Sequence, residues 1–110
     1  MTRLGYQIPN FTYPGVEPER LFPAITRQAV DAETAGFDTI LVMDHFYQLP
    51  ILGTPDQEMI ECYTLLAALA QHTSRARLSA LVTGNTYRNP TLLAKTVTAL
   101  DVVSEGRAQL

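Results

Sequence analysis

An acid and an imidazole stand side by side at Asp44 and His45, directly after the apolar run 39–42. An imidazole can take up and release protons at neutral pH, and a neighbouring carboxylate can orient it. The apolar run is typical of a strand buried in a parallel sheet, and ligands of such sheets bind at the carboxyl ends of the strands. The sequence therefore predicts Asp44 and His45 as catalytic residues at that edge.

Each of these residues also has a structural interpretation. His45 could hydrogen-bond a carbonyl group of its own loop, and Asp44 could cap or brace the long loop that follows it, because Asp favours such local bonds. Thr83 and Asn85, after the next predicted strand, have side chains that turns prefer, while their position also allows contact with a ligand. Arg88 is interpreted as a solvated or barrel-rim cation rather than as a ligand for an anion.

Three βα units are predicted to position these residues. Strands are expected at residues 4–8, 37–43 and 76–82, and helices at 23–35, 59–72 and from 90 up to Gly106. Asn89 is a favourable N-cap for the third helix, whose buried side is predicted to comprise Leu93, Val97, Leu100 and Val103. Residues 107–110 would begin a fourth strand.

Repeated βα units imply a parallel α/β sheet, either an open doubly wound sheet or part of a (β/α)8 TIM barrel. No Gly-x-Gly-x-x-Gly follows the first predicted strand, so a Rossmann dinucleotide site is not supported. The segment Thr83-Gly84-Asn85 lacks the flanking glycine and lysine of a Walker A motif. A full barrel takes about 250 residues, so 110 residues would form about half of one.

Composition excludes several classes of function. Hydrophobic residues make up 46% of the chain and charged residues 17%, which is typical of a globular domain. The net charge of −3 and the scattered basic residues argue against a nucleic-acid partner. With a single cysteine, no evident signal peptide and no apolar run long enough for a bilayer, a cytoplasmic protein without membrane contact is expected. No metal site is expected.

Five segments of the chain, taken in order, resemble the luciferase-like monooxygenase superfamily, and more narrowly its actinobacterial branch that uses the deazaflavin coenzyme F420. These segments are Leu4–Pro9, Ala35–Asp38, Val42–Phe46, Leu78–Pro90 and Asp101–Ala108. The resemblance implies a (β/α)8 TIM barrel, of which residues 1–110 would be a single domain, the N-terminal half, truncated after the third βα unit. It also implies that an isoalloxazine-type ring binds at the carboxyl ends of the strands.

The resemblance assigns roles to particular residues. Asp44 and His45 would line the ring and the substrate pocket, and a non-prolyl cis peptide at Ala80-Leu81, in a bulged third strand, would lie against the ring. The cofactor-binding residues expected on this basis are Ala80, Leu81, Val82, Thr83 and Asn85.

Three functions remain open from the sequence. The resemblance implies first an oxidoreductase that transfers a hydride between coenzyme F420 and a small organic substrate. The second is an FMN-dependent monooxygenase of the same family. The third is a non-catalytic half-barrel that persists by self-association, because three βα units leave free sheet edges and apolar helix faces. The expected partners are a small-molecule substrate and either a second copy or the missing C-terminal half of the barrel.

Overall fold

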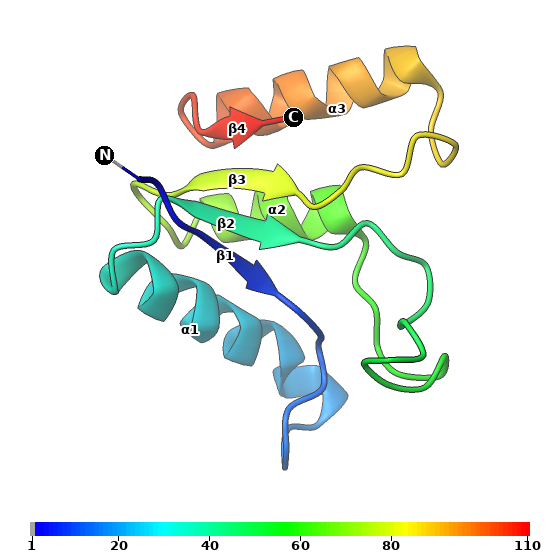
Figure 1. The fold of residues 1–110 in the computed structure, drawn as a ribbon. Coiled ribbons are helices and arrows are strands. Elements are labelled where there is room, and N and C mark those ends of the chain that lie inside the picture. The colour runs from blue at the N-terminus through cyan, green and yellow to red at the C-terminus, as the bar shows by residue number, and fades with distance from the viewer. Residues whose placement is uncertain (1) are drawn as a thin grey trace.

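A computed structural model describes residues 2–110 as a four-stranded parallel sheet with three α-helices packed against it (Figure 1). The elements in chain order are β1 Gly5–Ile8, the 3₁₀ helix η1 Pro18–Arg20, α1 Leu21–Thr34, β2 Thr39–Val42, α2 Cys62–Ala70, β3 Arg77–Ala80, α3 Pro90–Val103 and β4 Ala108–Gln109. The predicted α/β class, with three βα units and the start of a fourth strand, is confirmed.

The strands lie side by side in chain order, β1-β2-β3-β4, and every neighbouring pair is parallel. The register pairs Ile8 with Val42, and Val42 with Ala80. A doubly wound sheet reverses its strand order at a switch point, whereas a barrel keeps the order of the chain. The observed order therefore favours the barrel over the doubly wound alternative.

One hydrophobic core joins the sheet to the helices. On β2 the side chains of Ile40 and Val42 are fully buried and those of Thr39 and Leu41 only half-buried, which is the two-residue period of a strand. Helix α1 contributes Leu21, Ile25, Ala29 and Ala32 to this core, and α2 contributes Cys62, Leu65, Leu66 and Leu69. The sheet is thus anchored on its helix side.

Two predictions about the helices are wrong in detail. Helix α2 begins at Cys62 rather than near Met59, because the side chain of Glu61 caps it by accepting a hydrogen bond from Thr64 N at 2.6 Å. On α3 only Leu100 is buried, and Val103 of the predicted buried side is 45% exposed. The main contacts of α3 are with α2 and the two-residue β4, which cover only part of its apolar surface.

Two charged side chains fasten the loops at the amino ends of the strands. The carboxylate of Glu33, near the end of α1, accepts hydrogen bonds from the backbone N–H groups of Ser74, Arg75 and Ala76. The guanidinium of Arg107, just before β4, donates to the Thr73 hydroxyl and to the carbonyl oxygens of Ala70, Thr73, Ala76 and Ser104. Backbone groups between elements are thereby satisfied without water.

Between residues 2 and 110, none of the helices has the length and apolar character that crossing a bilayer requires.

Candidate active site at the carboxyl edge of the sheet

The long loop between β2 and α2 and the segment between β3 and α3 leave from the same edge of the sheet (Figure 1). Asp44, two residues beyond β2, joins them. Its buried carboxylate accepts hydrogen bonds from Gly84 N at 2.8 Å, from Arg88 Nη1 at 2.6 Å and from Arg88 Nη2 at 2.8 Å. Asp44 therefore braces two loops against each other, and its partners in the described chain do not include His45.

Arg88 is the centre of an ionic cluster. Its Nη2 also lies 2.5 Å from Glu61 Oε1, and its guanidinium carbon lies 4.9 Å from the ring centroid of Tyr63. The side chain of Arg88 lies at the carboxyl edge, as predicted for a rim cation, but it is only 15% exposed, so the prediction that it is solvated is wrong. The physical reason is the meeting of two strand ends, which brings a carboxylate separated by 44 residues within bonding distance.

The cluster is fully ionised near neutral pH. Burial alone would raise the pKa of the Asp44 carboxyl, but the hydrogen bonds from Arg88 and Gly84 outweigh it and lower that pKa. The pKa of Glu61 is lowered in the same way, against burial, by hydrogen bonds from Thr64 and Arg88. Asp44 raises the pKa of Arg88 in return. Two carboxylates and one guanidinium leave the cluster with a formal charge of −1.

A cleft of about 190 Å³ lies beside this cluster. Its polar side is formed by Asp44, His45, Glu61 and Arg88, and its apolar side by Phe46, Met59 and Tyr87. The rings of Phe46 and Tyr87 are 4.5 Å apart between centroids. The half-buried His45 is thus placed where a bound molecule could reach it, as a residue capable of proton transfer must be.

The segment after β3 forms an exposed apolar edge. Leu81 is 40% exposed and Val82 is 68% exposed. The cis peptide is found at Leu81-Val82 and not at the predicted Ala80-Leu81. The prediction is off by one residue because Leu81 N still donates to Val42 O at 2.8 Å, so the peptide before Leu81 continues the strand pairing.

The other predicted ring-binding residues are distributed differently. Ala80 packs against the core on the helix side. The Thr83 hydroxyl lies 2.7 Å from the Tyr63 hydroxyl, which links this segment to α2, and Asn85 is exposed. The Gly84 hydrogen bond joins this segment to Asp44, but Leu81, Val82 and Thr83 are not among the described residues that line the 190 Å³ cleft.

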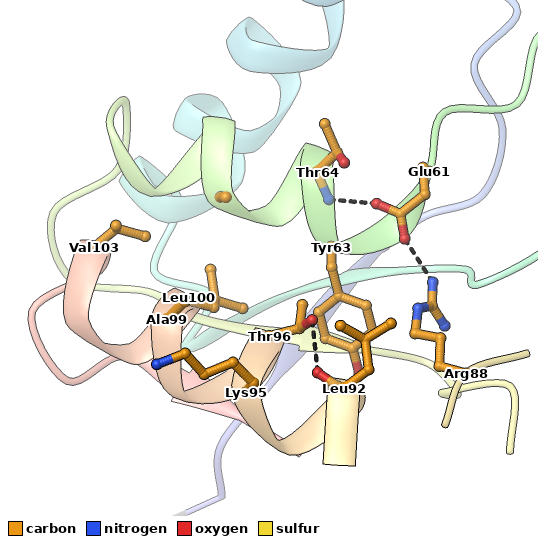
Figure 2. A pocket seen from close by; sticks show the side chains of 11 residues that line it. Glu61, Tyr63, Thr64, Arg88, Leu92, Lys95, Thr96, Ala99, Leu100 and Val103 are labelled. Carbon is orange, nitrogen blue, oxygen red and sulfur yellow. Dashed lines mark hydrogen bonds and ion pairs between the residues drawn. The ribbon is translucent and has the colours of Figure 1, made fainter. Parts of the chain in front are cut away.

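A larger hollow of about 520 Å³ runs between α2 and α3 (Figure 2). Glu61 and Arg88 border it, but most of its lining is apolar or small, such as Leu92, Ala99 and Val103. Its lining lies along two helices rather than at the strand ends, and it contains no histidine. The smaller cleft is the better candidate for chemistry, because it joins a histidine to the carboxyl edge.

No three His, Cys, Asp or Glu side chains within residues 2–110 gather as a metal ion would require. His72 lies two residues beyond the end of α2, and its ring centroid is 5.6 Å from that of Phe22. His45 and His72 therefore serve different regions of the molecule.

A family model described as luciferase-like monooxygenase matches residues 2–110 of this chain. A comparison with curated protein sequences gave no match.

Solved structures of similar fold include the oxygenating constituent of 3,6-diketocamphane monooxygenase from Pseudomonas putida, in complex with FMN. It is 22% identical with a TM-score of 0.80, over 100% of this chain and 29% of that one. The coenzyme F420-dependent tetrahydromethanopterin reductase from Methanopyrus kandleri is 22% identical with a TM-score of 0.73, over 96% and 25%. An F420-dependent secondary alcohol dehydrogenase, in complex with an F420-acetone adduct, is 24% identical with a TM-score of 0.74, over 99% and 30%.

These likenesses confirm the predicted fold as part of a luciferase-like TIM barrel. The chain spans less than a third of the length of these three structures.

Proposed function

Because this chain belongs to the luciferase-like monooxygenase family, we propose that it binds the redox ring of coenzyme F420 at the carboxyl edge of the sheet and contributes to hydride transfer to or from a small organic substrate. Members of this family are oxidoreductases and monooxygenases. F420 is placed first because two of the similar structures are F420-dependent enzymes. FMN is the alternative, since another contains it.

The hydrogen bond between Gly84 N and Asp44 is the observation that carries the proposal. It ties the acid-histidine segment after β2 to the exposed segment Leu81-Val82 after β3, so one edge offers both a proton-transfer group and an apolar surface. Large exposed apolar residues at a strand end are typical of a surface that a ligand covers. A flat conjugated ring fits such a surface.

His45 and Asp44 have different roles in the proposed reaction. When bound, the cofactor supplies or accepts the hydride. His45 lines the cleft and would donate the proton that the substrate heteroatom gains when the neighbouring carbon is reduced, or take it up in oxidation. Asp44 cannot serve as that acid, because its pKa is lowered and its oxygens are occupied by Arg88 and Gly84. We therefore assign proton transfer to His45 and positioning to Asp44.

The cofactor can be identified by native mass spectrometry of the chain mixed with equal amounts of coenzyme F420 and FMN. We expect a discrete species that carries one F420. A species carrying FMN would favour the monooxygenase alternative, and oxygen consumption with reduced FMN would then confirm it, because a deazaflavin does not react readily with oxygen. A bare chain would contradict ring binding by these residues.

Self-association is a second candidate, favoured by the exposed apolar surface of α3, where Leu92 is 57% and Val102 is 73% exposed. Two copies placed with β4 of one beside β1 of the other would together form eight parallel strands. The same mass spectrum tests this candidate: a dimer supports it, and a folded monomer contradicts it.

A further inference from the structure

We propose that the cleft beside the Asp44–Arg88–Glu61 cluster is a substrate subsite that selects a flat molecule with a hydroxyl or ammonium substituent and rejects carboxylates and phosphates. The inference rests on the proposed function, since it names the substrate class for the same edge of the sheet. It follows from the charge, the hydrogen-bonding capacity and the shape of the cleft.

The charge of the cleft disfavours anions. Arg88 is the one lysine or arginine among the described residues that line it, and it faces two carboxylates. The lowered pKa values of Asp44 and Glu61 keep both carboxylates charged at neutral pH. An anion entering the cleft would therefore meet a net negative charge, whereas a cation or a neutral donor would not be repelled.

Most of the hydrogen-bonding capacity of Arg88 is taken up by carboxylates of the chain itself. Both terminal nitrogens of its guanidinium are held by carboxylates, at 2.6 and 2.8 Å from Asp44 and at 2.5 Å from Glu61. Three of its five N–H donors are thereby taken, and a substrate carboxylate that approached the remaining two would face the charges of Asp44 and Glu61. We therefore assign Arg88 a positioning role, because its charge is offset by Asp44 and Glu61.

The hydrogen-bond acceptor available to a substrate is Glu61. Its side chain is 49% exposed although it accepts hydrogen bonds from Arg88 and Thr64, so its oxygens remain within reach of a ligand. A carboxylate oxygen accommodates more than one donor. A hydroxyl or ammonium group would therefore bind beside Glu61, within the same cleft as His45.

The opposite wall favours a flat apolar group. Phe46 is 66% exposed and Tyr87 is 43% exposed, although the two rings contact each other, and Met59 completes this wall. Aromatic rings and a thioether pack well against a further ring. An apolar cavity of about 150 Å³ is enough to hold benzene, so a cleft of about 190 Å³ suits one ring with a short polar substituent.

The test uses three probes with the same ring and different charge: benzylamine, benzyl alcohol and benzoate. Each is titrated at neutral pH and low salt into the 110-residue chain, and the NMR signals of Phe46, Tyr87 and His45 are followed. We expect saturable shifts at these residues, with benzylamine bound tightest and benzoate weakest, about tenfold apart. Equal or tighter binding of benzoate overturns the proposal, and so does the absence of saturable shifts at these residues with any probe.

Glu61→Gln provides the matched variant, because its amide oxygen can still cap α2 while the charge is removed. The ratio of benzylamine to benzoate affinity should fall by about tenfold in this variant. Glu17→Gln, which makes the same charge change at an exposed residue away from the cleft, should leave that ratio unchanged. An unchanged ratio in Glu61→Gln would contradict the assigned role of this carboxylate.

These titrations need no cofactor, so the proposed subsite and the proposed function can be contradicted independently of each other. Probe binding without F420 or FMN binding would contradict the proposed function and leave the subsite in place. Cofactor binding without probe selectivity would contradict the subsite alone.

Discussion

The two edges of the sheet use charged side chains in opposite ways. At the amino edge, Glu33 and Arg107 bind backbone N–H and carbonyl groups of neighbouring loops. At the carboxyl edge, Arg88 binds two carboxylates, and the large apolar side chains of Phe46 and Val82 are exposed. Charged side chains at the amino edge thus form hydrogen bonds with backbone groups, whereas those at the carboxyl edge form an ionic cluster, and apolar side chains at that edge are exposed.

This difference separates stability from binding. Side-chain bonds to backbone groups fix the loops at the amino edge. In α/β barrels the carboxyl face carries the active site and the amino face carries stability. The comparison predicts that substitutions at the amino edge act on unfolding, whereas those at the carboxyl edge act also on ligand binding.

The largest effect is expected from Arg107→Met at the amino edge. It removes five hydrogen bonds to Ala70, Thr73, Ala76 and Ser104, and leaves carbonyl groups without donors. We expect the free energy of unfolding to fall by about 3 kcal/mol. Urea denaturation measures this, with the exposed Arg27→Met as the control for the change of charge. If both variants lowered the free energy of unfolding equally, the stabilising role assigned to Arg107 at the amino edge would be contradicted.

The next effect is expected from Arg88→Met at the carboxyl edge. We expect the free energy of unfolding to fall by about 2 kcal/mol, which is less than for Arg107→Met. Without Arg88, the half-exposed Glu61 carboxylate can be solvated by water, and Asp44 still accepts the hydrogen bond from Gly84 N. The pKa of Asp44 should rise toward its ordinary value, which an NMR pH titration of the Gly84 amide would detect. Arg88→Lys should restore the charge but not both bonds to Asp44. An unshifted titration would contradict the role of Arg88.

Val82→Asp should weaken binding of F420 or FMN by more than about tenfold, because it places a charge on the exposed apolar edge. Val102→Asp is the matched control, since this valine on α3 is similarly exposed, at 73% against 68%. Fluorescence titration measures both. The free energy of unfolding should change little in either variant. Weaker cofactor binding in Val102→Asp, or unchanged cofactor binding in Val82→Asp, would contradict the assignment of cofactor binding to the carboxyl edge rather than to α3.

The smallest effect is expected at Glu33. Burial would raise its pKa, but the hydrogen bonds from Ala76, Arg75 and Ser74 lower it below the ordinary value of 4.5. A lowered folded-state pKa stabilises the fold above the unfolded value, and this contribution is lost as the pH falls through the folded-state value. Unfolding of Glu33→Gln should therefore depend less on pH below about 4.5, by less than about 1 kcal/mol. An unaltered acid dependence would contradict this role.

Local features of the fold could be predicted from the sequence because they depend on neighbouring residues. Asn89 caps α3 as predicted, since its side chain accepts a hydrogen bond from Thr91 N. Gly36 and Gly106, predicted to follow helices, both have positive φ, at 97° and 84°. The parallel pairing of the strands follows in the same way from repeated βα units, whereas their order does not, because a doubly wound sheet has the same repeats.

The ionic cluster could not be predicted in the same way. Arg88 meets Asp44 only because parallel strands end at one edge, and the sequence alone does not reveal which side chains turn toward each other there. The sequence signal that could have indicated this ion pair is an acid, Asp44, after one predicted strand and an arginine, Arg88, after the next. The exposed Val103 was mispredicted because helical spacing indicates an apolar face, but not whether another element covers it.

The most direct measurement is a ¹⁵N-resolved NMR titration of the chain with coenzyme F420, repeated with FMN. The shifts should concentrate at residues 44–46 and 81–85, while the loop 73–76 held by Glu33 and Arg107 should not respond. Shifts centred on the amino edge or on the α2–α3 groove, or no saturable shifts with either cofactor, would contradict the assignment of ligand binding to the carboxyl edge.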